Sequence, residues 1–257
     1  MTSAGDLSRG VLCGYTGAMS EDARPYLTVP RLESLPWLVH GFGTAGWQEE
    51  DLRAAAGFER FRPVIMRQVH SDLAHRIDAA PEGRLEGDAL MTRVPGLLLV
   101  VRTADCLPAF LVDEGNRAVA AVHCGWRGTQ ERILENAVRA MARDYGSAPG
   151  DMLAALGPCI GSTCYEVGPE VRTSFLRAGF PPSILAECPG GRGRYMLDLR
   201  ASNIWLLEGL GIRKENILDT GAVCTHCELS LLSYRRDHRE ERRMLNFIGL
   251  RASSGAA

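Results

Sequence analysis

Short runs of apolar residues, each closed by turn-forming residues, most constrain the fold of this chain. Gly96 to Val101 is a continuous apolar run that follows Pro95, as expected of a buried strand. Ala118 to Val122 repeats the pattern, and further strands are predicted at residues 63–69, 152–156, 217–220 and 244–250. Apolar residues at helical spacing predict helices at 133–141, 169–178 and 198–210. The segment 181–194, rich in Pro, Gly and Arg, is predicted to be a loop.

The predicted strands outnumber the helices that could connect parallel strands, which favours an α+β fold over a doubly wound one. The 257 residues are enough for a substantial core. We expect a single domain over residues 26–251, built from mixed β-sheet layers flanked by helices. Residues 1–25 are predicted to be a poorly ordered N-terminal extension.

Composition is that of a globular protein, with 46% hydrophobic and 23% charged residues. The formal charge of −2 gives no basic field for nucleic acid. The first 25 residues lack the pattern of a signal peptide, and no apolar run approaches the roughly 20 residues that span a bilayer. Eight cysteines are then best explained as reduced thiols or metal ligands, so we expect a cytoplasmic protein without a membrane partner.

Three potential metal ligands lie near the ends of predicted strands: His70, Cys106 and His123. If the strands share a sheet, the three side chains could converge at one rim, where loops usually carry function. Two histidines and one cysteine suit zinc, and three protein ligands leave a fourth position open for chemistry. Spacing alone leaves the alternative of two histidines bonded to backbone carbonyls and one buried thiol.

Six sequence blocks, in order from about Pro63 to Leu250, resemble the signatures of one family. The blocks are Gln68-Val69-His70-Ser71, Gly87-Asp88-Ala89-Leu90, Thr103-Ala104-Asp105-Cys106-Leu107-Pro108, His123-Cys124-Gly125-Trp126-Arg127-Gly128-Thr129, Gly157-Pro158-Cys159-Ile160-Gly161 with Cys164-Tyr165-Glu166-Val167-Gly168, and Ser233-Tyr234-Arg235-Arg236. They look like the laccase-domain, YfiH-like group of zinc-dependent purine nucleoside phosphorylases, formerly labelled polyphenol oxidases.

The resemblance implies a single-domain α+β fold, similar to the catalytic domain of cytotoxic necrotising factor toxins. It implies a zinc ion on His70, Cys106 and His123. It also implies phosphorolysis of adenosine, inosine and methylthioadenosine, with adenosine deaminase activity beside it, so the expected partners are purine nucleosides and phosphate. Some members are described as peptidoglycan editing factors, and the toxins hydrolyse amides with a Cys-His pair. The alternative is therefore a metal-free Cys-His hydrolase with Cys106 as nucleophile.

The chain departs from the family pattern in two places. Family members commonly carry Thr-Thr-Arg-x-Gly-Gly before the first ligand, whereas this chain has His40-Gly41-Phe42-Gly43-Thr44-Ala45-Gly46-Trp47 and then Glu49-Glu50. Loss of that arginine raises the hypothesis of a different substrate, or of an interaction protein without catalysis. The second departure is Cys124, next to a ligand. It is best explained as a tolerated buried thiol, although this second soft atom could also bind copper.

Five further residues are candidates for catalysis or substrate binding. Asp105 is predicted to orient a ligand imidazole, with a turn cap as the alternative. Gln68 alternates with His70 along the predicted strand and would face the substrate. Arg127, at a helix start, and the pair Arg235 and Arg236 could bind phosphate, or else lie on solvated charged faces.

Other arrangements of metal ligands carry less weight. Cys159, Cys164, Cys224 and Cys227 could form a structural zinc site with four thiolates, because Cys224 and Cys227 have CxxC spacing. Four residues separate Cys159 from Cys164, however, and the family implies no such site. A multicopper oxidase needs many more histidines than the six present. A homo-oligomer is compatible with the sequence.

Overall fold

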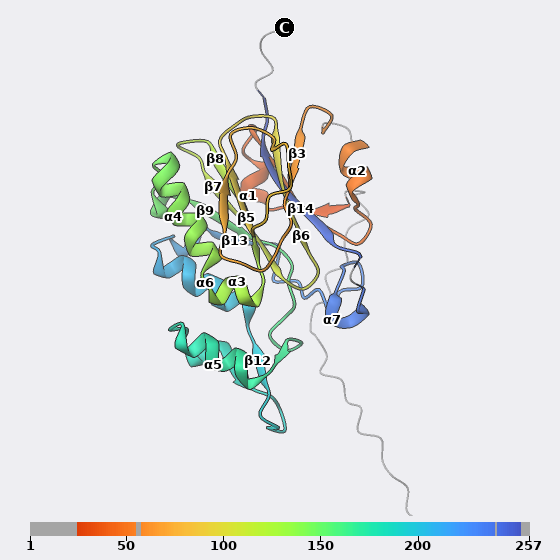
Figure 1. The fold of residues 1–257 in the computed structure, drawn as a ribbon, viewed down its shortest axis with the longest axis vertical. Coiled ribbons are helices and arrows are strands. Elements are labelled where there is room, and N and C mark those ends of the chain that lie inside the picture. Colours follow the sequence, from red (N-terminus) through yellow and green to blue (C-terminus); the bar gives the residue numbers. More distant parts are fainter. Residues whose placement is uncertain (1–24, 55–57, 240, 253–257) are drawn as a thin grey trace, which may run out of the picture.

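Two mixed β-sheets form the centre of the fold in this computed structural model, which describes residues 25–54, 58–239 and 241–252 (Figure 1). The five-stranded sheet has the order β1 Tyr26–Leu27, β2 Leu38–Gly43, β14 Met244–Leu250, β6 Leu97–Thr103 and β3 Arg62–Ile65. The six-stranded sheet has the order β13 Ile217–Asp219, β9 Leu153–Leu156, β7 Leu107–Asp113, β8 Ala118–Cys124, β5 Ala89–Thr92 and β4 Ala74–Arg76. Most neighbours are antiparallel, so few crossover helices are needed.

The main core lies between these two sheets. Phe42 of β2 stacks on Phe110 of β7, with 4.4 Å between ring centroids, and both side chains are fully buried. The central strands β6, β7 and β8 are buried on nearly every residue. Two covered faces explain why their sequences are continuous apolar runs rather than alternating ones.

Helices cover the outer faces of the sheets (Figure 1). The other face of the six-stranded sheet packs on α4 Ile133–Tyr145 and α6 Leu199–Gly209, with α3 Trp126–Gln130 beside them. Asp198 caps α6 by accepting the Ala201 N–H. The remaining helices are α1 Pro30–Glu33, α2 Glu49–Ala54, α5 Pro169–Arg177 and α7 Tyr234–Asp237. Three short 3₁₀ turns span Pro149–Asp151, Pro182–Ile184 and Lys214–Asn216.

The structure confirms the predicted single-domain α+β fold with mixed sheets and flanking helices. Residues 1–24 of the predicted extension lie outside the described residues, and the boundaries 26–251 stay a prediction. The segment 181–194 was wrongly predicted as a loop. It contains β11 Leu185–Glu187, which pairs with β12 Tyr195–Leu197 in a small sheet completed by β10 Glu166–Val167. Leu185 is its only buried residue in a strand, too short an apolar signal for the sequence to reveal.

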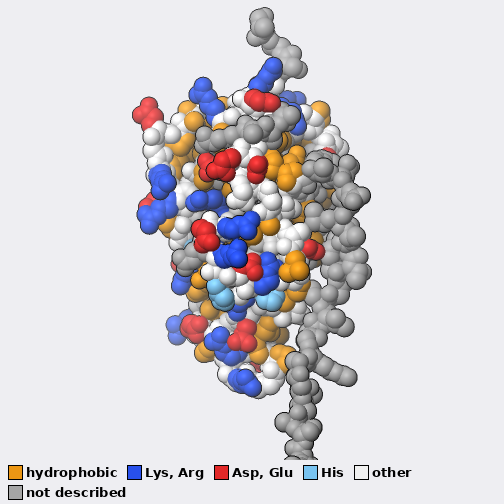
Figure 2. All heavy atoms as spheres, turned by 90° about the vertical axis from the view of Figure 1, so that its right-hand side faces the viewer, with side chains coloured by type: hydrophobic (Ala, Val, Ile, Leu, Met, Phe, Trp, Pro, Cys, Tyr) orange, Lys and Arg blue, Asp and Glu red, His pale blue; other side chains and the backbone are white. Residues whose placement is uncertain are grey.

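In the part of the chain that is described, none of the helices combines the length and apolar character that crossing a bilayer requires. On the face drawn in Figure 2, basic and acidic side chains are interspersed rather than gathered by sign.

Candidate metal centre and its pocket

The antiparallel pairing of β7 with β8 brings Cys106 close to His123. Leu107 of β7 lies opposite Cys124, and Pro108 lies opposite His123. Cys106 precedes the start of β7, while His123 is the penultimate residue of β8. Cys106 also lies shortly after the end of β6 Leu97–Thr103, as the sequence predicted. The two residues meet because an antiparallel pair sets the beginning of one strand beside the end of the next.

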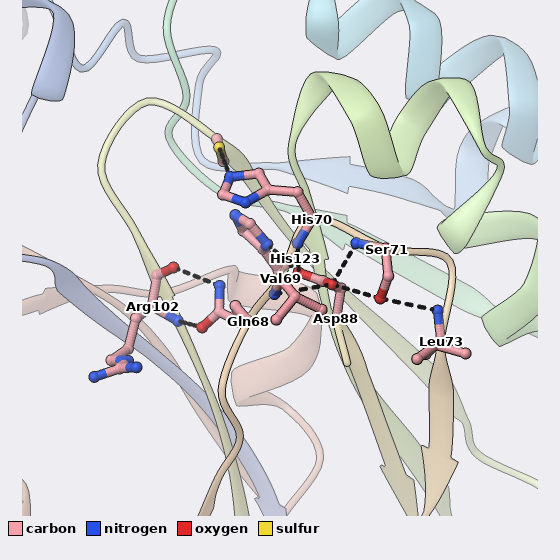
Figure 3. Close-up of polar contacts among 9 residues, drawn as sticks. Gln68, Val69, His70, Ser71, Leu73, Asp88, Arg102 and His123 are labelled. Atoms are coloured by element: carbon pink, nitrogen blue, oxygen red, sulfur yellow. Dashed lines mark hydrogen bonds and ion pairs between the residues drawn. The ribbon is translucent and has the colours of Figure 1, made fainter. Parts of the chain in front are cut away.

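His70 lies in the loop after β3 and not at a strand edge, because β3 ends at Ile65. Its backbone has φ of 60°, in the left-handed region that few non-glycine residues adopt. The Asp88 carboxylate holds this turn by accepting the backbone N–H groups of His70 (3.1 Å) and Ser71 (2.6 Å). Figure 3 shows the loop wrapped around this carboxylate.

Asp88 also orients His123, the second ligand imidazole. Its Oδ1 lies 2.7 Å from His123 Nδ1, and both side chains are almost completely buried. This contact leaves Nε2 of His123 to face His70 and Cys106. The residue predicted for this role was Asp105, and that prediction is wrong. The Asp105 carboxylate instead accepts the Thr225 hydroxyl and the Arg235 backbone N–H.

The three candidate ligands fit a metal ion. Their ligand atoms all lie within 4.8 Å of one another, and Cys106 Sγ is 3.9 Å from His70 Nε2. A tetrahedral zinc ion with bonds of about 2.3 Å to sulfur and about 2.0 Å to nitrogen places such atoms about 3.6 Å apart. Gly125 makes the approach of His70 possible, because a Cβ there would lie 2.7 Å from His70 Cδ2.

Electrostatics favours an ionised cysteine at this site. Burial raises the pKa of the Cys106 thiol, but the adjacent His123 and His70 lower it further, to about 6. Burial likewise opposes protonation of His123, yet Cys106 and Asp88 raise its pKa to about 9. A thiolate stable at neutral pH is what both metal binding and nucleophilic attack require.

A cavity of about 630 Å³ opens above the three ligands. Its other lining residues are Gln68, Arg102, Ala104, Asp105, Trp126, Tyr165, Tyr234, Arg235, Glu241 and Arg243. The volume is in the range of small-molecule sites. Aromatic rings and arginines therefore surround a site that can hold a metal, and Arg102 and Arg243 are cations that the sequence interpretation did not single out.

The predicted substrate residues differ in where they point. Gln68 lines the cavity, but its amide is bonded in both directions to the backbone of Arg102 (Figure 3). Arg127 is exposed and lies over the Trp126 ring, at 4.6 Å from its centroid, outside the cavity lining. Gln68 is thus a wall residue, and Arg127 is the surface arginine of the alternative.

Arg235 and Arg236 have different surroundings. Arg235 lines the cavity, lies over the Tyr165 ring and donates twice to the carbonyl of Glu166. Arg236 turns away and donates to the backbone carbonyls of Thr225, His226, Glu228 and Leu231. Arg236 therefore stabilises the turn before α7, and it is not among the residues that line the cavity.

The segment that departs from the family pattern contacts an arginine from elsewhere in the chain. Ala45, in the loop that replaces the expected arginine motif, accepts a hydrogen bond from Arg242 through its carbonyl. The neighbouring Arg243 reaches the cavity. The chain just before β14 thus places a cation at the cavity.

Comparison with known proteins agrees with this architecture. A family model described as multi-copper polyphenol oxidoreductase laccase matches residues 47–251. The chain belongs to this laccase family. The matched segment contains all three candidate ligands and every strand of the two sheets except β1 and β2.

Named relatives of the laccase-family chain are enzymes of nucleoside metabolism. It is 38% identical to "Purine nucleoside phosphorylase" of Deinococcus radiodurans, over 79% of this chain and 76% of the relative. It is 39% identical to "Adenosine deaminase RL5" of an unknown prokaryotic organism, over 67% and 69%. The crystal structure of the Bacillus licheniformis hypothetical protein YfiH has 27% identity and a TM-score of 0.80, covering 89% of this chain and 98% of that one.

Proposed function

We propose that this chain is a zinc-dependent purine nucleoside phosphorylase for adenosine, inosine and methylthioadenosine, with adenosine deamination as a second activity. The observation that carries the proposal is the convergence of His70, Cys106 and His123 at a cavity lined by aromatic rings and arginines. The names of two relatives support the two reactions. We also propose that the protein works in the cytoplasm, where thiols are kept reduced, because Cys106 can act as a ligand only when it is reduced.

His70 Nε2, Cys106 Sγ and His123 Nε2 would hold the zinc ion, with Asp88 fixing both histidines. Zinc bound there supplies a Lewis acid with one open position. Copper also accepts two imidazoles and a thiolate, and the family description mentions it. We favour zinc because neither phosphorolysis nor deamination transfers electrons, so a redox-inert ion is sufficient.

The cavity residues suit the two substrates of phosphorolysis. Trp126, Tyr165 and Tyr234 offer ring faces to a purine. In the reaction a phosphate oxygen bonds to ribose C1′ as the bond from C1′ to the base breaks and its electron pair leaves with the purine. Arg102 and Arg243 would hold the phosphate monoanion or dianion in place. Burial raises the pKa of the Tyr165 phenol, which therefore stays neutral and able to donate a hydrogen bond.

Product analysis of adenosine incubations tests the proposal. With phosphate we expect adenine and ribose 1-phosphate, and without it only inosine from the slower reaction with water. All three products should disappear in Cys106→Ala, while the control Cys188→Ser, which changes a cysteine that does not line the cavity, should behave as wild type. An unchanged Cys106→Ala enzyme would refute the assignment.

A metal-free Cys-His hydrolase is the second candidate, and one observation favours it. Cys106 lies 3.9 Å from His70 Nε2 and has a lowered pKa without any metal. Zinc would then inhibit the enzyme, and an amide or ester would be its substrate. Zinc inhibition of turnover is the result that separates this candidate from the first.

A further inference from the structure

A second group of metal-binding side chains lies outside the cavity, between two loops. Ligand atoms of Cys164, His226 and Cys227 all lie within 4.8 Å of one another, and the three side chains are half-buried. Cys164 lies in the loop between β9 and β10, whereas His226 and Cys227 belong to the turn that precedes α7. The three residues are thus brought together by the fold and not by sequence proximity alone.

The sulfur atoms have the spacing of metal ligands and not of a disulfide. Cys164 Sγ and Cys227 Sγ are 3.5 Å apart, whereas bonded sulfurs lie about 2.05 Å apart. Two sulfurs on one tetrahedral zinc ion, each with a bond of about 2.3 Å, are about 3.8 Å apart. The observed separation is close to that second value.

Cys224, on the same turn, is a candidate fourth ligand beside the group of Cys164, His226 and Cys227. Its Sγ accepts the Gly161 backbone N–H at 3.1 Å. Backbone N–H groups directed at sulfur stabilise a thiolate, which is the form that binds metals. The two cysteines of Cys224-Thr225-His226-Cys227 therefore have the spacing of a zinc-binding turn, and Cys224 Sγ also has a backbone N–H donor.

Cys159 does not belong to this group, although the sequence made it a candidate. It is buried in the core beside β9 and contacts the turn through its backbone, whose carbonyl accepts the Thr225 N–H. His226 takes its place among the candidate ligands. Arg236 donates to the carbonyls of Thr225 and His226, which places a positive charge beside a site with several thiolates.

We propose that Cys164, Cys224, Cys227 and His226 bind a second, structural zinc ion that joins two loops of the cavity wall. Tyr165, which follows Cys164, lines the cavity, and Thr225, which follows Cys224, donates to Asp105 next to Cys106. Four protein ligands would leave the ion no open position, so it would support structure rather than chemistry. The inference concerns residues outside the proposed active site and does not depend on the proposed function.

Metal analysis in the Cys106→Ala background tests this inference, because that substitution removes a ligand of the first site only. We expect about one zinc ion per chain in Cys106→Ala, and after exchange with cobalt(II) a thiolate-to-cobalt charge-transfer absorption. Adding Cys164→Ser and Cys227→Ser should abolish the zinc and the absorption. Adding Cys188→Ser, a half-buried cysteine of the β11–β12 hairpin, should change neither.

Two further measurements guard against unfolding as the cause. His226→Ala keeps the three sulfurs, so it should retain the charge-transfer band while lowering zinc affinity at least 10-fold. Zinc should raise the Tm of Cys106→Ala but not that of the variant that also lacks Cys164 and Cys227. Metal-free Cys106→Ala protein, an absorption unaffected by loss of Cys164 and Cys227, or a Cys164–Cys227 disulfide in protein purified without air would overturn the inference.

Discussion

Asp88 links the two histidines of the candidate metal centre. A single buried carboxylate accepts the Ser71 hydroxyl and backbone N–H groups on the His70 loop, and it also pairs with the ring of His123. Carboxylates in this position set the tautomer and the direction of a ligand imidazole. The geometry of the site therefore depends on a residue that would not itself touch the metal.

Replacing Asp88 with Asn tests this link. Burial raises the pKa of Asp88, but the contacts with His123 and Ser71 lower it further, to about 2. A depression of this size corresponds to about 2 kcal/mol of folding free energy. This stabilisation is fully present above the unfolded-state pKa of about 4 and is lost as the pH falls toward 2. At pH 7 we expect Asp88→Asn to be less stable by about 2 kcal/mol, and denaturant titrations should show the difference shrinking below pH 4.

The same substitution should weaken zinc binding about 10- to 100-fold, measured by competition with a chelating dye. Asp113→Asn is the matched control, because Asp113 is a buried carboxylate that binds Asn116 at the far end of β7. It should leave zinc affinity unchanged. Equal affinities in Asp88→Asn and wild type would contradict the role assigned to Asp88.

The ionisation of Cys106 gives a pH-dependent prediction for the metal-stripped protein. The thiol is expected to titrate at about pH 6, because His123 stays protonated up to about pH 9 and stabilises the thiolate. Alkylation of Cys106 by iodoacetamide should therefore rise through a midpoint near pH 6. Peptide mass spectrometry can compare it with Cys188, whose pKa is raised by burial. A midpoint for Cys106 above pH 8 would be inconsistent with this pairing.

At the scale of elements, the pairing of strands decides which residues meet. The sequence revealed β6, β8, β9 and β14 as apolar runs but not β7. Pro108 lies near the start of β7 and argues against a central strand, since it lacks an N–H group. Without β7 the register between Cys106 and His123 could not be derived. The sequence therefore supported only a conditional argument that the three ligands converge, and the family resemblance strengthened it.

The directions of individual side chains could likewise not be predicted from the sequence. Asp88 stood in a quoted motif, yet its contact with His123 follows from the pairing of β5 with β8. Arg235 and Arg236 are adjacent, but one faces the cavity and the other binds carbonyls of the turn. Local sequence patterns report burial and periodicity, whereas these contacts depend on tertiary packing.

Substitutions of Arg243 and Arg236 distinguish an arginine that binds phosphate from one that stabilises the fold. Arg243→Gln should raise the KM for phosphate about 10-fold with little change in stability, because Arg243 lines the cavity. Arg236→Gln should lower the free energy of unfolding by about 2 kcal/mol, because several carbonyls lose a charged donor. Steady-state kinetics and denaturant unfolding of both variants check this, and a raised phosphate KM in a fully stable Arg236→Gln enzyme would reverse the assignment.

At the scale of the whole molecule, the two-sheet core supports a rim where loops from distant parts of the chain converge. The α+β class and single domain followed from the sequence because buried strands outnumber helices. The cavity could not be predicted from the sequence. Its lining residues come from the loops that follow β3 and β9, from the ends of β6 and β8 with the residues after them, and from the chain around α7. The loop after β9 and the turn before α7 also carry the second group of metal-binding side chains, Cys164, His226 and Cys227. This group and the wall of the cavity therefore form one continuous part of the structure.

Zinc dependence of adenosine turnover tests the central claim most directly. The wild-type protein would be stripped with a chelator and titrated with zinc while phosphate-dependent release of adenine is followed. We predict that turnover is lost on stripping and returns with zinc, and that zinc restores nothing in Cys106→Ala. Full turnover by the stripped protein would contradict the claim and favour catalysis by the Cys106 thiolate and its histidines.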